Sequence, residues 1–282
     1  MRSIQELERL ATELRLHIMN MMGANKAHHF GGSLSAADLM TGIYFHGMRY
    51  DPQNPTWPER DRFVMSKGHC VPAQYAALAM LGVFPLAELA TLKQLGTRLQ
   101  GHPAAHLLPG IEACTGSLGQ GLSFANGMAL AGRMQQRDYR LYCLMGDGET
   151  HEGQVWEAAR TTAQQRLHNV TAIIDRNGLK AMDSSYAAAD LGHLAGRWAA
   201  LGWAVREIDG HNMAEIVTAL DWARAEDQAP CVILAATVKG RGVSLLEGQA
   251  QYHNAALSPE QLAAAIAELE APVTRGAKEQ AQ

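Results

Sequence analysis

The chain alternates between short apolar runs and longer segments with helical spacing. An apolar run that ends in small glycines predicts a buried strand at 141–145, and further strands are predicted at 62–66, 170–174, 204–208 and 231–236. Apolar or small residues at helical spacing predict helices at 4–18, 36–44, 73–81, 84–95, 122–133, 155–167, 191–201 and 213–225. Strands that alternate with helices form parallel sheets with right-handed crossovers. We therefore predict an α/β fold, a doubly wound parallel sheet with helices on both faces.

The ends of this pattern define one domain. Ser258 and Pro259 form the cap and first turn of a final helix. Residues 272–282 are polar, so we predict a domain over 1–271 and a flexible tail over 272–282. We expect loops at 27–35, with Ser35 as N-cap of the next helix, and at 101–121, where a long aperiodic segment suggests function.

Composition narrows the class of protein. The 282 residues carry 24 Lys plus Arg and 28 Asp plus Glu, a formal charge of −4, without a basic stripe along the sequence. This balance favours neither nucleic acid nor a membrane surface as partner. The four cysteines have no metal-binding spacing, so we expect reduced thiols in or near the core. With no signal peptide or long apolar run, a soluble cytoplasmic protein is expected.

Two polar residues follow neighbouring predicted strands. Asp147 stands in Gly146-Asp147-Gly148, and Asn177 follows the strand at 170–174. Oxygen ligands on adjacent strand ends suit Mg²⁺ shared with a diphosphate, which could lie near the helix N-terminus beyond Gly148. Gly-Asp-Gly alone is also common as a structural turn. A dinucleotide fingerprint is disfavoured, because His151 replaces its third glycine.

Histidines and charged residues in loops are further candidates. His29, His69, His102 and His253 lie in predicted loops, where α/β proteins build ligand sites, and imidazoles bind phosphates and move protons. A single loop histidine is more often simply solvated. No spacing supports zinc. Glu149, Glu152 and Glu157 can be helix-start acids, and the default interpretation of Lys239 and Arg241 is a solvated pair.

Several motifs, in chain order, resemble transketolases and cover nearly the whole sequence. The strongest part runs from Gly146-Asp147-Gly148-Glu149 through Trp156-Glu157-Ala158 to Asp175-Arg176-Asn177-Gly178-Leu179 and resembles the family's thiamine diphosphate motif. The remaining matches are His29-Phe30-Gly31-Gly32-Ser33-Leu34-Ser35, Ser66-Lys67-Gly68-His69, Gly101-His102-Pro103, Thr115 to Gly121, Asp209-Gly210-His211 and Lys239 to Ser244.

The resemblance implies a thiamine diphosphate-binding fold and assigns roles to residues of this chain. The implied ligands of Mg²⁺ or Ca²⁺ are Asp147, Asn177 and the Leu179 carbonyl. The implied catalytic residues, which would hold sugar hydroxyls and move protons, are His29, His102 and His253. The implied cofactor-binding residues are His69, Gly116, Ser117, Leu118, Asp147, Gly148, Glu149, Asn177 and His253.

The sequence also departs from the family pattern. His28 and Phe30 stand where glycine and a proline or small aliphatic residue are usual, which suggests altered substrate entry. Lys180-Ala181-Met182 replaces a glutamine-led segment, which puts partner contacts or substrate preference in doubt.

The resemblance and the length together imply a two-chain enzyme. Full transketolases also have a pyrimidine-binding domain, with the glutamate that activates the cofactor, and a C-terminal domain. We therefore expect the N-terminal subunit of a split transketolase, inactive alone, which joins a separate subunit in an α2β2 assembly. Such an enzyme transfers a two-carbon ketol unit from a ketose or ketose phosphate to an aldose or aldose phosphate. The alternatives are the alpha-type subunit of a 2-oxo acid dehydrogenase and a non-catalytic cofactor-binding homologue.

Overall fold

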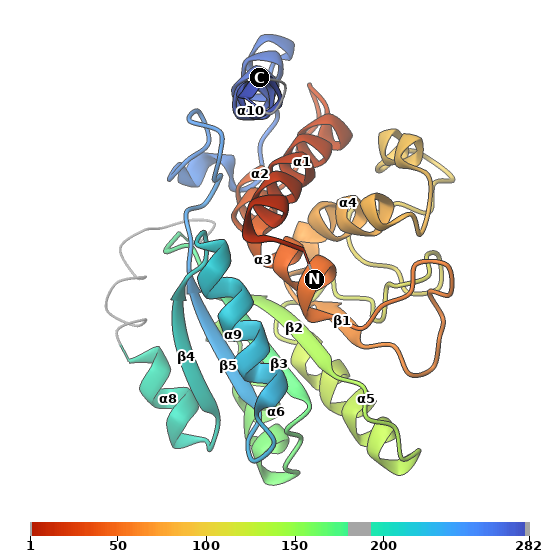
Figure 1. Cartoon of the computed structure of the whole chain (residues 1–282), viewed down its shortest axis with the longest axis vertical. Helices are drawn as coiled ribbons and strands as arrows, with labels where there is room; N and C mark the ends of the chain where they lie inside the picture. Colours follow the sequence, from red (N-terminus) through yellow and green to blue (C-terminus); the bar gives the residue numbers. More distant parts are fainter. Residues whose placement is uncertain (1, 180–192, 280–282) are drawn as a thin grey trace.

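The computed structural model describes residues 2–179 and 193–279 (Figure 1). Its strands are β1 (Arg62–Met65), β2 (Leu141–Gly146), β3 (Val170–Arg176), β4 (Ala204–Asp209) and β5 (Cys231–Ala236). Its α-helices are α1 (Ile4–Met22), α2 (Phe30–Ser35), α3 (Ala37–Gly42), α4 (Val71–Leu81), α5 (Gly121–Met134), α6 (Gly153–Gln164), α8 (Leu194–Ala200), α9 (Met213–Ala225) and α10 (Pro259–Glu279). A short π turn forms η1 (Ile43–Gly47). The short 3₁₀ turns are η2 (Gly68–Cys70), η3 (Leu86–Thr91), η4 (Gly148–His151) and η5 (Ala250–His253).

The strands of the described residues form a parallel sheet in the order β1-β2-β3-β5-β4. All five predicted strands are present, and the predicted α/β fold with a parallel sheet is confirmed. In the register of β2 and β3, Gly146 pairs with Asp175. Because parallel strands point the same way, the segments that carry Asp147 and Asn177 leave the sheet at the same edge.

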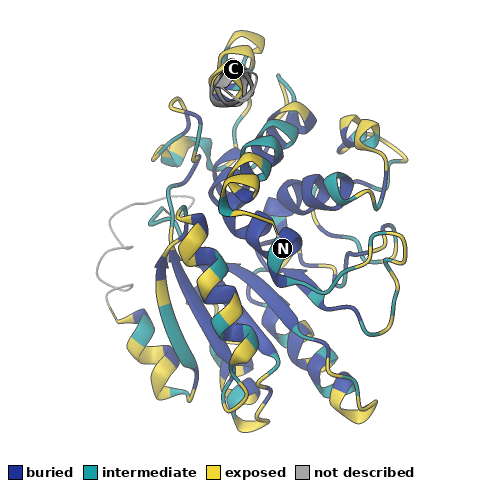
Figure 2. Ribbon diagram, in the orientation of Figure 1, coloured by how far each residue is buried: buried dark blue, intermediate teal, exposed yellow. Residues whose placement is uncertain are grey.

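Helices cover both faces of the sheet. Along β2, Tyr142 and Leu144 pack in a core formed with α1, α3, α4 and α9, whereas Cys143 and Met145 pack in a second core formed with α5, α6 and α8. Side chains alternate between faces along a strand, so one strand contributes to both cores. The strands are largely buried, and the outer sides of α8 and α9 are exposed (Figure 2).

The segment predicted as the loop 27–35 contains helix α2 instead. Its two glycines serve close packing, because a Cβ on Gly31 would lie 2.7 Å from Lys239 Cγ and one on Gly32 would lie 2.7 Å from Cys70 Sγ. Ser35 is not the N-cap of the next helix, as was predicted from sequence. Its hydroxyl donates to the carboxylate of Asp175, and α3 begins without a side-chain cap.

Other predicted helices differ in extent. The segment 84–95 is helical only as the 3₁₀ turn η3, and the positive φ of 59° at Lys93 is incompatible with a helix that continues to residue 95. The segment 36–44 is divided between α3 and the π turn η1. The predicted start of the 191–201 helix lies outside the described residues, and α8 covers the rest.

The final helix begins as predicted, with Gln261 N–H donating to Ser258 Oγ. Helix α10 continues past residue 271, so the domain boundary there stays a prediction. Cys70, Cys143 and Cys231 are buried, but Cys114 is exposed, contrary to the expectation of four core or near-core thiols. No helix within 2–179 and 193–279 has the length and apolarity needed to cross a membrane.

Candidate active site

A pocket of about 360 Å³ opens at the carboxyl ends of β1, β2, β3 and β5. It brings together nearly all of the predicted site residues. Ser117 is exposed and is not among the lining residues. The lining residues are His29, Gly32, Lys67, His69, His102, Gly116, Leu118, Gly146, Asp147, Gly148, Glu149, Asn177, Leu179, Lys239 and His253.

Asp147 and Asn177 lie on neighbouring strand ends, as the sequence pattern predicts. The backbone N–H of Asp147 donates to the Asp175 carbonyl at 3.2 Å, which continues the β2–β3 ladder beyond β2. Asp147 Oδ1 and Oδ2 accept N–H groups of Gly148 and Gly178 at 2.7 and 2.8 Å. Burial raises the pKa of Asp147, and the nearby Asp175 raises it further. A bound cation would offset the cost of this buried charge.

A buried ion pair between Lys67 and Asp175 forms the floor of the site. Asp175, at 0% exposure, accepts hydrogen bonds from Lys67 Nζ, Ser35 Oγ and Thr237 Oγ1. Burial would raise the pKa of Asp175, but the charge of Lys67 and the hydrogen bonds from Lys67, Ser35 and Thr237 together lower it. The pair joins the end of β3 to the segments that follow β1 and β5 and to helix α2. The sequence motif contains Lys67 and Asp175, but nothing in it indicates that they pair.

Glu149 holds the loop that precedes α5. Its carboxylate accepts hydrogen bonds from Ser66 Oγ, Gly119 N–H at 2.8 Å and Gly146 N–H at 3.1 Å. Burial raises its pKa, and these donors act in the opposite direction. Glu149 therefore positions three segments around the pocket, and it is not the simple helix-start acid considered from sequence.

The predicted histidines form a cluster in the pocket. The ring centroids of His29 and His69 are 4.9 Å apart, and His253 lies 5.3 Å from His29 and 5.4 Å from His69. His102 is 6.4 Å from His29 and is the exposed member. Burial is the main cause that lowers the pKa of His29 to about 3 and those of His69 and His253 to about 4, and repulsion by nearby positive charges adds to it. These imidazoles are therefore neutral at pH 7.

Lys239 belongs to the pocket, which corrects its interpretation as one of a solvated pair. Only 2% of the residue is exposed. Its Nζ donates to the Leu179 carbonyl at 3.1 Å and lies 3.0 Å from His253 Nδ1. The ammonium thus donates to His253 Nδ1, and the ring proton of neutral His253 must sit on Nε2. Burial lowers the pKa of Lys239.

His28 and Phe30 lie away from the pocket. Both are buried, at 3% and 0% exposure, and their rings contact each other edge to face. His28 also pairs with Ala255 in an isolated bridge that holds the segment after η5 beside α2. The structure therefore gives no support to a direct effect of these residues on substrate entry. Lys180 lies outside the described residues.

Comparison with known families identifies the chain. The family described as "Transketolase, thiamine diphosphate binding domain" matches residues 7–271. The chain belongs to the transketolase family. This membership confirms the resemblance read from the motifs, and it disfavours the 2-oxo acid dehydrogenase alternative.

Relatives in the transketolase family fall into two length classes. The chain is 44% identical over 265 residues to the 6-deoxy-6-sulfo-D-fructose transketolase subunit SqwG of Clostridium sp. (strain MSTE9), covering 94% of this chain and 96% of the relative. It is 39% identical over 276 residues to an apulose-4-phosphate transketolase subunit of Phocaeicola vulgatus, covering 98% of each. Human transketolase is 38% identical, but this chain spans 42% of its length.

Solved transketolase structures have the same fold. Transketolase from Campylobacter jejuni superposes with a TM-score of 0.88 at 33% identity, covering 95% of this chain and 43% of that chain. Transketolase from Leishmania mexicana superposes with a TM-score of 0.87 at 31% identity, covering 95% and 41%. The doubly wound arrangement is thus that of the transketolase thiamine diphosphate-binding domain.

The chemistry of the pocket fits the transketolase cofactor. Asp147, Asn177 and the Leu179 carbonyl present three types of oxygen donor to one pocket, and the Leu179 carbonyl already accepts the cationic Lys239 ammonium. Among the described residues, no group of three or more His, Cys, Asp or Glu could hold a metal. Amide and carbonyl oxygens, together with a diphosphate, would therefore complete a magnesium shell.

Proposed function

We propose that this chain is the thiamine diphosphate-binding subunit of a two-chain transketolase. The observation that carries the proposal is the pocket at the strand ends, which combines the Asp147 and Asn177 oxygens, two lysines and four histidines. The proposal is further supported by relatives that are named as transketolase subunits, because this chain matches them over nearly their whole length. The pyrimidine-binding and C-terminal domains would be supplied by a separate chain, in an α2β2 assembly.

The cofactor proposal assigns a role to each side of the pocket. Asp147, Asn177 and the Leu179 carbonyl would hold Mg²⁺ or Ca²⁺, whose charge would offset that of the diphosphate. His69, Gly148 and His253 would approach the diphosphate, and Gly116 and Leu118 would line the cleft. When bound, thiamine diphosphate supplies the carbanion chemistry that breaks and forms the bond next to a ketose carbonyl.

The histidines of this chain would handle the sugar. His29, His102 and His253 would bind its hydroxyls and move protons. His253 presents Nε2–H because Lys239 occupies Nδ1. The neutral state of His29 lets it both accept and donate a hydrogen bond. The two relatives of similar length are named for 6-deoxy-6-sulfo-D-fructose and apulose-4-phosphate, ketoses that carry an anionic group. We propose a ketose of this class as donor and an aldose or aldose phosphate as acceptor, in the cytoplasm.

The test combines the chain with a separately encoded subunit that carries the pyrimidine-binding and C-terminal domains. Transfer of a ketol unit is followed by NMR over a panel of ketose donors and aldose acceptors. We expect transfer with both chains and none with either chain alone. Activity of this chain alone would contradict the two-chain proposal. Cofactor binding by the complex without any transfer would favour the non-catalytic alternative.

A second experiment tests the metal ligands without relying on activity. Binding of thiamine diphosphate to the complex is measured by calorimetry with Mg²⁺ and with EDTA. We expect Asp147→Asn to weaken Mg²⁺-dependent binding at least about tenfold, because the carboxylate is lost from the shell. Asp209→Asn, at the exposed last residue of the edge strand β4, is the control. Unchanged binding by Asp147→Asn would refute the metal assignment and leave the two-chain proposal standing.

A further inference from the structure

A second and larger cavity lies at the opposite edge of the sheet. This arginine groove has a volume of about 510 Å³. It is formed by the segments that lead into β2 and β3, together with the ends of α5 and α9 and the segment after η1. These segments meet the sheet at the amino ends of its strands, whereas the active-site pocket lies at the carboxyl ends. The groove is therefore separate from the active-site pocket.

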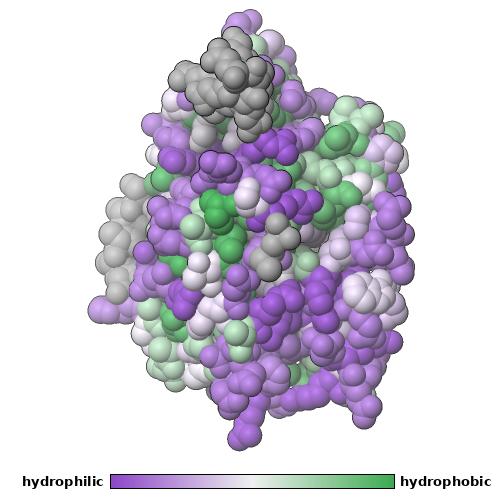
Figure 3. Space-filling view, in the orientation of Figure 1, coloured by the Kyte–Doolittle hydropathy of each residue, from purple (hydrophilic) through white to green (hydrophobic). Residues whose placement is uncertain are grey.

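Arginines dominate the lining of the groove. The groove is lined by six arginines: Arg49, Arg133, Arg137, Arg140, Arg166 and Arg224. The carboxylates that balance this charge are Asp138 in the lining, buried Asp61, and Glu59, which pairs with Arg137. Positive charge therefore exceeds negative charge, although the whole chain carries a net charge of −4. Much of the lower half of the face in Figure 3 is hydrophilic.

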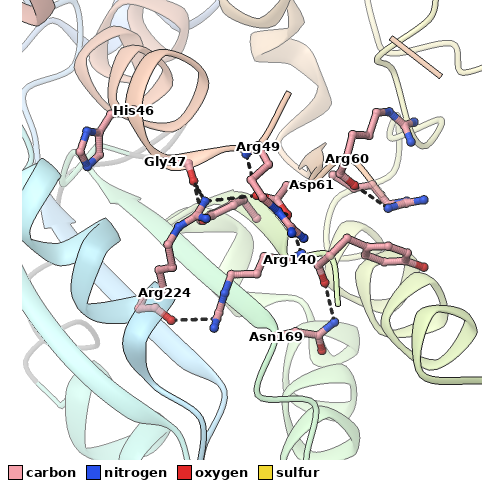
Figure 4. A network of polar contacts seen from close by, with 12 residues as sticks. His46, Gly47, Arg49, Arg60, Asp61, Arg140, Asn169 and Arg224 are labelled. Carbon is pink, nitrogen blue, oxygen red and sulfur yellow. Dashed lines mark hydrogen bonds and ion pairs between the residues drawn. The ribbon is translucent and has the colours of Figure 1, made fainter. Parts of the chain in front are cut away.

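Buried Asp61 organises one wall of the groove (Figure 4). Its carboxylate, at 0% exposure, accepts the backbone N–H groups of Arg49 at 2.7 Å and Arg140 at 2.8 Å. It also pairs with the guanidinium groups of Arg49 at 3.3 Å and Arg224 at 3.2 Å. One carboxylate thus draws cationic side chains from distant segments to the same place.

Backbone carbonyls hold further guanidinium groups in position. Arg140 Nη1 donates to the Ala223 carbonyl at 3.0 Å, and Arg133 Nη1 donates to the Gln165 carbonyl at 2.7 Å. Arg224 also donates to the Gly47 carbonyl. A carbonyl fixes a guanidinium without neutralising its charge. Each guanidinium has five N–H donors, so Arg133 and Arg140 keep most of theirs for a ligand, whereas Arg49 uses most of its donors on Asp61 and Asp138.

We infer that the arginine groove binds a small polyphosphate, either free or as the phosphate chain of a nucleotide. Arginine matches phosphate oxygens with two parallel N–H donors, and fixed side chains lose less freedom on binding. The spread of six arginines around one concave site suits several linked phosphates better than a single one. Small molecules bind in concave sites of this volume and not on flat protein surfaces. This inference does not depend on the proposed function.

The test measures binding of inorganic tripolyphosphate to the full chain by calorimetry in EDTA, which removes divalent metal from the active-site pocket. We expect saturable binding at least about tenfold tighter than that of orthophosphate. ADP in a parallel titration distinguishes a nucleotide from free polyphosphate as source. Equal affinity for orthophosphate and tripolyphosphate, or no saturable binding, would overturn the inference.

Variants locate the binding site. Arg133→Gln with Arg166→Asn removes two exposed charges, and asparagine suits the positive φ of 52° at position 166. We expect this pair to weaken tripolyphosphate binding at least about tenfold. Arg9→Gln with Arg160→Gln removes two exposed charges elsewhere and should change binding less than about twofold. Lys239→Met alters the active-site pocket, and loss of binding in that variant alone would place the ligand there and overturn the inference.

A chemical measurement on the unaltered chain avoids any effect of substitution on folding. Phenylglyoxal modifies accessible arginines, and mass spectrometry assigns the modified positions. Tripolyphosphate should protect Arg133, Arg137 and Arg166 but not Arg9. Protection at none of the groove arginines would also overturn the inference.

Discussion

Lys67 donates a hydrogen bond to the carboxylate of Asp175, two residues before the predicted metal ligand Asn177. Both side chains are almost fully buried, at 3% and 0% exposure. The same carboxylate accepts hydrogen bonds from Ser35 and Thr237. The pair therefore fixes the end of β3 relative to three other segments of the pocket.

Loss of the Lys67 ammonium should destabilise the chain strongly. Lys67→Met leaves Asp175 buried without its cation, and removal of one partner of a buried pair costs about 3–5 kcal/mol. Urea unfolding should show a fall of this size in the free energy of unfolding. The control is Arg176→Gln, which breaks the exposed pair with Glu207 and should cost less than about 1 kcal/mol. Equal effects of the two substitutions would contradict the role of Lys67.

Gly68 should not tolerate a side chain. A Cβ at this position would lie 1.5 Å from the Thr115 carbonyl oxygen, so the segment 115–120 or the turn η2 would have to move. Gly68→Ala should lower the thermal unfolding midpoint by several degrees and weaken cofactor binding by the complex. Gly127→Ala, inside α5 with open space around it, is the control and should raise helix stability by up to about 1 kcal/mol. A fully stable Gly68→Ala chain would contradict this packing.

Acid should destabilise the ligand-free chain. His29, His69 and His253 have native-state pKa values of about 3 to 4, below the ordinary 6.5. Below pH 6.5 the unfolded chain binds protons that the folded chain does not, so stability is lost as pH falls from about 6.5 toward 4. Urea unfolding at pH 7.5 and 5 measures this loss.

Variants identify the groups responsible for the acid effect. His29→Gln should flatten the pH dependence of the free energy of unfolding, because one depressed pKa is removed. His168→Gln alters an exposed histidine and serves as the control. An unchanged pH dependence in His29→Gln would show that other groups cause the loss.

His102 should act on the sugar and not on cofactor binding. It is exposed on the rim of the pocket, so its removal should not disturb the buried diphosphate end. In the two-chain complex, His102→Ala should lower kcat/KM for a ketose donor at least about tenfold and leave cofactor affinity unchanged. His106→Ala alters an exposed histidine nearby and should leave both unchanged. A normal kcat/KM for His102→Ala would refute its assignment.

Much of the fold and pocket could be predicted because the relevant patterns are local. Strands β2 and β5 are continuous apolar runs, and parallel strands bring the residues at their carboxyl ends to one edge, so Asp147 and Asn177 could be placed together. The helix at α2 was missed because Gly31 and Gly32 favour turns locally, whereas here they allow close contact with Lys239 and Cys70.

The remaining features depend on tertiary contacts between distant segments. Lys239 looks like a solvated loop residue until the fold places it beside Leu179 and His253. The arginine groove could not be predicted from the sequence, because its arginines form no basic stripe along the chain. Its members are spread from Arg49 to Arg224 and meet only at the amino ends of the strands.

The hydrogen bond from Asp147 N–H to the Asp175 carbonyl has an evolutionary consequence. The separation between the two strand ends is set by the pairing of β2 with β3, and not by the length of the chain that connects them. Insertions at the turn between α6 and β3 would therefore leave the proposed metal site intact as long as the strand register holds. A shift of β3 by one residue would instead move Asn177 to the other side of the sheet edge.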